Sequence, residues 1–216
     1  MLHRIKKLFH LEKKEEETQT VYDKINDLFD SLNDDTILVQ IGSDLTPFGD
    51  FICEVIASLR DEIKDECGFI LPPVRIRDNE CYQENEYTID IHGEHAGGGF
   101  LVPNEEGIRV EFYETLKTVV YERIDDIFTN EIAEKYINIV QRDNSWLIWN
   151  LTNLLSVVDI RTILSDIICA GKSINNINYI FEKIGEQILS SGEYRDCGKK
   201  YNPHTISKAI SKYLYK

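Results

Sequence analysis

The side chains best suited to metal chemistry are clustered in the short segment His92-Gly93-Glu94-His95. On a β-strand, His92 and His95 would project to opposite faces, because side chains alternate along a strand. The HExxH spacing, which places two ligands on one turn of a helix, is absent. A zinc site needs at least three protein ligands. The segment is therefore a weak candidate, and we expect neither a metal nor another cofactor.

Other catalytic motifs are missing from the sequence. It has no GxSxG nucleophile motif, no phosphate-binding P-loop and no dinucleotide-binding GxGxxG element. Gly97-Gly98-Gly99 is followed by Phe100-Leu101 and is typical of a flexible connection. The 5 cysteines form no CxxC pair and have no histidine beside them, which favours structural thiols in a reducing compartment. We therefore expect no catalytic residues.

Charged residues alternate with apolar ones in Val74-Arg75-Ile76-Arg77-Asp78, which predicts a half-solvated strand. Arg75, Arg77 and Asp78 form a basic pair beside an acidic residue, and they could bind an acidic partner. They could equally make ion pairs within the chain. The second role is the commoner one for exposed charges on such a strand.

Trp146 and Trp149 are three residues apart, on one side of a predicted helix start. They could anchor a helical core, or they could present an aromatic contact to a partner protein. Tryptophan is usually buried, so the core interpretation is favoured.

The elements before residue 113 alternate between strand and helix periods. Thr46 and Pro47 are typical of a helix start, and apolar residues then recur at helical spacing until Gly68. Strands are predicted at residues 37–41, 74–77, 87–91 and 108–112. The expected order is β-α-β-β-β. The last three strands should pair as an antiparallel meander, with the helix covering one face.

Every strong pattern after Tyr113 is helical. Ser156-Val157-Val158-Asp159 is typical of a capping box, and Gly171 is placed to end the helix that follows. Ser173 is expected to start the next helix, and Asn202-Pro203 the last. The predicted fold class is therefore α+β, with a small antiparallel sheet domain followed by an all-α helical bundle.

Charge and length limit the classes of partner. The 216 residues include 24 Lys and Arg against 38 Asp and Glu, which gives a net charge of −14 and would repel nucleic acid. No apolar run reaches the ~18 residues that a membrane-spanning helix needs. We divide the chain into a helical basic leader (1–33), an α/β part (34–112) and a helical part (113–216).

The leader has basic residues among apolar ones at helical spacing in residues 1–14. Two interpretations remain open. It could form a short helix on an anionic membrane surface, or it could be a frayed terminus, which is the commoner case. It lacks the apolar core and cleavage site of a signal peptide.

Three consecutive motifs resemble the cytoplasmic region of the FHIPEP, or FlhA-like, family of export-gate proteins of flagellar and type III secretion. Residues 59–69 are similar to its I-x-x-I-R-x-x-x-A-x-x-x-G-F helix, residues 72–79 (PPVRIRDN) to P-x-V-x-I-R-D-N, and residues 85–93 to N-x-Y-x-I-x-x-x-G. Residues 153–188 and 201–215 resemble the helical patterns that follow in the family, although Asn175 and Asn176 replace its Arg-Asp pair.

The chain also departs from the family pattern. The family has a long transmembrane part before this region, and this chain has only the leader there. Residues 100–110 stand where the family inserts a second subdomain, and a fourth subdomain is expected to be missing. The resemblance therefore implies a reduced cytoplasmic region that corresponds to the first and third subdomains.

In the family these subdomains support a ring that receives export chaperones and substrates. The resemblance implies a non-enzymatic, protein-binding role in the cytoplasm, with Arg75, Arg77 and Asp78 as contact residues within a scaffold motif. Expected partners are export chaperones, secretion substrates or gate components, together with self-association. Membrane contact is expected only through the leader. The alternative is a cytosolic regulator or adaptor that kept the fold and lost the secretion role.

Overall fold

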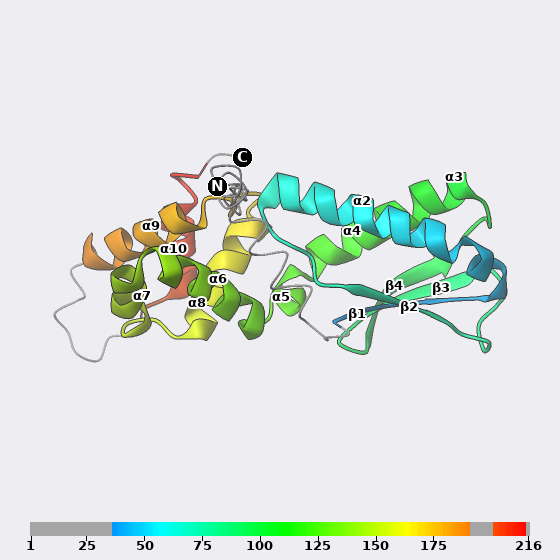
Figure 1. Cartoon of the computed structure of the whole chain (residues 1–216), viewed down its shortest axis with the longest axis horizontal. Helices are drawn as coiled ribbons and strands as arrows, with labels where there is room; N and C mark the ends of the chain where they lie inside the picture. The colour runs from blue at the N-terminus through cyan, green and yellow to red at the C-terminus, as the bar shows by residue number, and fades with distance from the viewer. Residues whose placement is uncertain (1–35, 191–200, 215–216) are drawn as a thin grey trace, which may run out of the picture.

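A computed structural model describes residues 36–190 and 201–214. A four-stranded sheet has helices α2 (Gly49–Cys67) and α4 (Tyr113–Glu122) side by side on one face, and a group of helices lies beyond one end of the sheet (Figure 1). The predicted α+β class is confirmed. The predicted leader, residues 1–33, lies outside the described residues.

The sheet has the strand order β2-β1-β3-β4. Its strands are β1 (Ile37–Ile41), β2 (Val74–Asp78), β3 (Glu86–Ile91) and β4 (Glu94–Phe100). β1 pairs with β2 in parallel and with β3 antiparallel, and β3 pairs with β4 antiparallel. The β-α-β-β-β order is present, but its last strand is β4 rather than the expected residues 108–112, and the predicted meander is wrong. Helix α2 returns the chain to the start of the sheet, so β2 runs beside β1 in the same direction.

The strand expected at residues 108–112 is helical. It forms the π-helical turn η2 (Ile108–Phe112) between α3 (Glu105–Gly107) and α4. Ile108 and Phe112 are buried and four residues apart, a spacing that fits a helix as well as alternation fits a strand, whereas Val110 is 56% exposed. The Asn104 side chain caps α3, at the start of this helical stretch, by accepting the Gly107 N–H at 2.8 Å.

The segment expected to be a flexible glycine connection is instead the edge strand β4. A Cβ on Gly97 would lie 2.7 Å from Val119 Cγ2 on α4, and one on Gly98 would lie 2.4 Å from the Tyr87 carbonyl oxygen. Glycine at these positions lets α4 and β3 approach the strand closely. The glycines are therefore explained by packing.

Helix α2 ends where the sequence predicts and begins differently. Gly68 adopts a left-handed φ of 73°, and its N–H bonds to the Lys64 carbonyl at 2.8 Å. A short 3-10 helix, η1 (Ser43–Phe48), precedes α2 and contains Pro47. Thr46 does not cap α2, because its hydroxyl bonds back to the Gly42 carbonyl oxygen at 3.4 Å.

The described residues that follow α4 are mostly helical, as expected. Its helices are α5 (Ile124–Ile127), α6 (Asn130–Asp143), α7 (Ser145–Thr152), α8 (Val157–Cys169), α9 (Ile177–Ser190) and α10 (Pro203–Ile210). The capping box of Ser156 and Asp159 is present, α8 ends just before Gly171, and Asn202 caps α10. Helix α9 begins at Ile177, four residues later than predicted, because Ser173 accepts the Asn175 N–H in a turn instead.

One apolar core includes residues of the sheet and of the helices beyond it. At the junction, the Phe128 ring packs between Phe69 and Tyr136, with ring centroids 5.3 and 5.7 Å apart. The Tyr136 hydroxyl donates to the Gly68 carbonyl oxygen at 3.2 Å, and the Ile174 N–H donates to the Cys67 carbonyl oxygen at 2.7 Å. The end of α2 is thereby attached to the helical half. Among the helices described here, none has the length and apolar character needed to cross a bilayer.

Polar contacts hold α4 against α2. Lys117 pairs with Glu62, and the Tyr121 hydroxyl donates to Glu66 Oε2 at 2.9 Å. Burial, followed by the hydrogen bond to Glu66, raises the pKa of the Tyr121 phenol. The hydrogen bond to Glu62 raises the pKa of Lys117.

These shifts predict that the protein loses stability in alkaline solution. In the unfolded chain a tyrosine ionises at pH ~10, whereas folded Tyr121 keeps its proton to higher pH. The stabilisation is therefore complete below that pH and is lost as pH rises. Urea unfolding at pH 8 and pH 11 should show a smaller pH effect in Tyr121→Phe than in wild type. Tyr213→Phe removes an exposed phenol and is the control; an unchanged pH effect in Tyr121→Phe would contradict the prediction.

Candidate functional site

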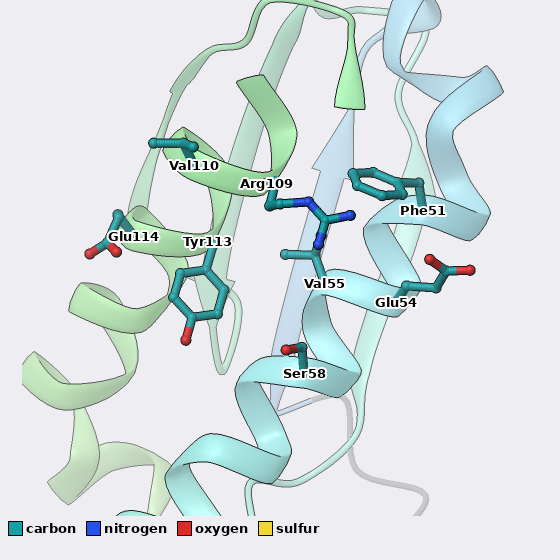
Figure 2. A pocket seen from close by; sticks show the side chains of 8 residues that line it. All are labelled: Phe51, Glu54, Val55, Ser58, Arg109, Val110, Tyr113 and Glu114. Atoms are coloured by element: carbon teal, nitrogen blue, oxygen red, sulfur yellow. The ribbon is translucent and has the colours of Figure 1, made fainter. Parts of the chain in front are cut away.

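A groove of about 480 Å³ lies between α2 and the turn from η2 to α4 (Figure 2). The segments that form it are far apart in sequence and are brought together by the packing of α4 beside α2. Its lining residues are Phe51, Glu54, Val55, Ser58, Arg109, Val110, Tyr113 and Glu114.

Arg109 is the only cationic side chain in this lining. Its guanidinium carbon lies 4.9 Å from the centroid of the Phe51 ring, a cation–π contact. Within residues 36–190 and 201–214, Arg109 makes no hydrogen bond or ion pair. Figure 2 shows the guanidinium reaching across the groove toward Phe51, while the carboxylates of Glu54 and Glu114 point away on either side.

The rest of the lining is mostly apolar or neutral. Phe51 and Tyr113 are half-buried, and Val110 is 56% exposed. Phe100 and Val102, in the segment that leads from β4 to α3, are also more than half exposed. Exposed apolar side chains next to a polar rim are typical of protein-interaction surfaces. The groove offers contacts for protein side chains, and its lining contains no nucleophile paired with a base.

Sequence reasoning missed this groove. The strand predicted at residues 108–112 gives Arg109 and Val110 the wrong neighbours, and Phe51 belongs to the predicted apolar stripe of α2. The four-residue spacing of Ile108 and Phe112, together with Asn104 as a cap, would have indicated the helical turn.

Arg75, Arg77 and Asp78 are exposed on β2, which forms one edge of the sheet. Arg75 is opposite Leu38 and Arg77 opposite Gln40, so both lie on the face away from the buried residues of β1. Both arginines interact with other groups of the chain. They do not line the groove, and their role as partner contacts stays a prediction.

Trp146 and Trp149 lie on the solvent side of α7 and are 73% and 65% exposed. The interpretation that they anchor the core is therefore wrong. Ile148 and Leu151 supply the buried face of α7 instead, and the helix has no charged residue. The alternative, that the two indoles contact a partner protein, stays a prediction.

The histidines have separate structural contacts. His92 is in the β3–β4 turn with a φ of 50°, and its Nε2 hydrogen-bonds to the Asp126 carbonyl oxygen at 3.0 Å. His95 Nδ1 lies 3.6 Å from Asp90 Oδ1. In the described part of the chain, no three His, Cys, Asp or Glu side chains are grouped to hold a metal.

A serine, a histidine and an aspartate meet between α8 and α10. Asp166 Oδ2 accepts the Ser207 hydroxyl at 2.6 Å and lies 2.8 Å from His204 Nδ1. The serine hydroxyl faces the carboxylate rather than the imidazole, and Ser207 is 2% exposed. A catalytic serine needs its hydroxyl on the base. This group therefore connects the two helices.

Comparison with known sequences identifies the relatives of the chain. The FHIPEP family model matches residues 3–111. Flagellar biosynthesis protein FlhA of Borreliella burgdorferi is 23% identical over 223 residues, which cover 81% of this chain and 32% of the relative. FlhA of Bacillus subtilis is 31% identical over 99 residues, covering 40% of this chain and 15% of the relative. The chain thus spans less than a third of either relative.

Solved structures show the same fold at low identity. The Chlamydia pneumoniae CdsV protein has a TM-score of 0.64 at 12% identity, over 81% of this chain and 69% of CdsV. The complex of CdsV with CdsO gives 0.65 at 12% identity, over 81% of this chain and 64% of that chain. Nonameric EPEC SctV-C gives a TM-score of 0.63 at 13% identity, over 81% of this chain and 63% of that chain.

The match to the family model covers just over half of this chain and includes the strands of the sheet, helix α2 and Arg109. The sequence relatives are flagellar FlhA proteins, and the fold is shared with CdsV and SctV-C. This protein therefore belongs to the FHIPEP family.

Proposed function

We propose that this chain is a non-enzymatic, protein-binding module of a flagellar or type III secretion system. Membership of the FHIPEP family supports a role in secretion. The observation that carries protein binding is the groove between α2 and α4, where Arg109 and the half-buried rings of Phe51 and Tyr113 share a lining with the exposed Val110. Its partners would be export chaperones, secretion substrates or gate components. The similarity to CdsV, whose solved complex contains CdsO, supports a protein partner.

We further propose that the module acts in the cytoplasm and that the leader contacts the membrane. Its α/β part (34–112) and helical part (113–216) would correspond to the first and third subdomains of the export-gate region. Helix α4 follows that boundary in sequence but packs with α2 beside the sheet. Self-association is a further proposal, supported by the nonameric state of the similar SctV-C.

The first test is affinity capture of the tagged chain from its own cells after mild crosslinking, with mass spectrometry and a mock-tagged control. Enrichment of secretion chaperones, substrates or gate components would establish the proposed role. If other cytosolic proteins are enriched without any secretion component, the chain is instead a regulator or adaptor that kept the fold.

The groove is expected to be the surface that captures partners. Val110→Glu adds a charge to its apolar rim at a side chain that is already 56% exposed, so the fold should tolerate it. Partner recovery should fall about fivefold or more, as for a central interface residue. Val158→Glu is the matched control, because Val158 is 50% exposed on α8, away from the groove lining. Equal recovery with both variants would assign binding to another surface.

The indoles of α7 are expected to form a second contact surface. Replacing both Trp146 and Trp149 with asparagine should change the free energy of unfolding by less than about 0.5 kcal/mol, because neither side chain is buried. Sedimentation equilibrium should show weaker self-association, or affinity capture a loss of specific partners. A marked loss of stability, or no change in either assay, would contradict the prediction.

A further inference from the structure

We propose that the groove between α2 and α4 selects protein segments in which a single carboxylate is next to an apolar side chain, and that Arg109 binds the carboxylate. The inference rests on the proposed function, because it gives the chemistry of the partner at the same groove. It requires no particular partner protein and can be tested independently of secretion.

The first step is the charge of the groove. Arg109 is an exposed residue that lines the groove with its cation, and no carboxylate of the described residues pairs with it. Arg123 and Arg161, by contrast, have acceptors within the chain: Arg123 pairs with Asp126 at 2.7 Å, and Arg161 donates to the Asp125 carbonyl oxygen at 3.0 Å. The N–H groups of Arg109 thus remain available for a ligand, and a carboxylate matches their planar fork.

The second step is orientation. The contact with the Phe51 ring places the guanidinium carbon 4.9 Å from the ring centroid, and the five N–H groups of the guanidinium make no hydrogen bond within the described residues. It restricts a side chain that would otherwise lose conformational entropy on binding. The Phe51 ring lies beside the cation and Tyr113 is on the same helical turn as Arg109, while Val110 points away from the guanidinium, so a segment that reaches Arg109 also meets two aromatic rings (Figure 2).

The third step limits how many acidic residues the groove accepts. Glu54 and Glu114 stand on its two sides with their carboxylates directed outward. A second or third acidic residue in the bound segment would approach one of these charges and be repelled. The groove should therefore prefer one carboxylate with apolar or basic neighbours over a run of acidic residues.

The experiment is selection of a phage-displayed library of random 12-residue peptides on the immobilised full chain. The wild type should enrich peptides with one Asp or Glu within two positions of Phe, Leu or Ile. Arg109→Gln should lose the acidic preference, and Arg142→Gln should keep it, because Arg142 is an exposed arginine outside the groove. Circular dichroism checks that each variant is folded.

The affinity of one selected peptide then gives the size of the effect. Arg109→Gln should weaken binding roughly 10- to 100-fold, as expected when a hydrogen bond to a charged group is lost. Changing the peptide's acid to its amide should cost a similar factor, and combining both changes should cost little more than either alone. Arg109→Lys, which keeps the charge without the planar fork, should give an intermediate affinity.

The inference is overturned if the library enriches nothing, if the enriched peptides lack an acidic residue, or if Arg109→Gln binds them as well as wild type. These outcomes are separate from failure of the proposed function. Acid-bearing peptides that need Arg109, in a protein that captures no secretion component, would support this inference and contradict the proposed role. Capture of secretion proteins that is unchanged in Arg109→Gln would support the proposed role and contradict this inference.

Discussion

Gly68→Ala is expected to lower the free energy of unfolding by about 2 to 5 kcal/mol, through two additive causes. Gly68 adopts a φ of 73°, where a side chain is strained. A Cβ there would also lie 2.6 Å from the Asn175 backbone nitrogen and 2.9 Å from its Cα. Neither atom can move without shifting the segment between α8 and α9, which is attached to the end of α2.

Gly171→Ala separates these two causes. Gly171 has a similar φ of 68°, but a Cβ there would meet nothing within 4 Å. Its replacement should cost only the backbone strain, about 1 kcal/mol. Urea unfolding of both variants measures the difference. Equal losses for the two variants would show that Asn175 moves aside easily and that the end of α2 is not held tightly.

Cys67 provides a second readout beside Gly68. Its thiol is buried and donates to the Ile63 carbonyl oxygen at 3.0 Å, and burial raises its pKa. Alkylation of Cys67 in the native protein therefore requires local opening of the end of α2, whereas Cys53 and Cys81 are exposed. Gly68→Ala should increase the alkylation rate of Cys67 by a much larger factor than the rates of Cys53 and Cys81.

The features predicted correctly from sequence are those specified by nearby residues. Gly68 ends α2, Ser156 and Asp159 start α8, and Asn202 starts α10, because each cap is formed by residues within one turn of the helix end. The apolar stripe of α2 is equally local. These signals do not depend on where the rest of the chain lies.

The errors concern features that depend on distant contacts. The parallel pairing of β2 with β1 depends on the path of α2, and the role of Gly97 depends on Val119 of α4. Trp146 and Trp149 share a helix with the buried Ile148 and Leu151, and the sequence does not say which side faces the core. The groove also depends on distant contacts, since Phe51 and Arg109 meet only after α4 has packed beside α2.

Phe128→Ala is the second change with a large expected effect, a loss of about 3 to 5 kcal/mol in the free energy of unfolding. The Phe128 side chain is 0% exposed and packs on Phe69, which follows α2, and on Tyr136 of α6. Removing its ring leaves a cavity between the sheet part and the helical part of the core. Tyr136→Phe keeps that packing and removes only the hydrogen bond to the Gly68 carbonyl oxygen, so it should cost about 1 kcal/mol.

Native-state hydrogen exchange on Phe128→Ala would show whether the two parts unfold together. The core is continuous from β1 to α9. The free energy of opening measured by exchange should therefore fall by the same amount for the amides of both elements. If the amides of α9 lost protection while those of β1 kept theirs, the helical part would be a separate cooperative unit. In that case the groove between α2 and α4, which belongs to the sheet part, would keep its shape when the helices beyond it open. Peptide binding by Phe128→Ala would then match the wild type.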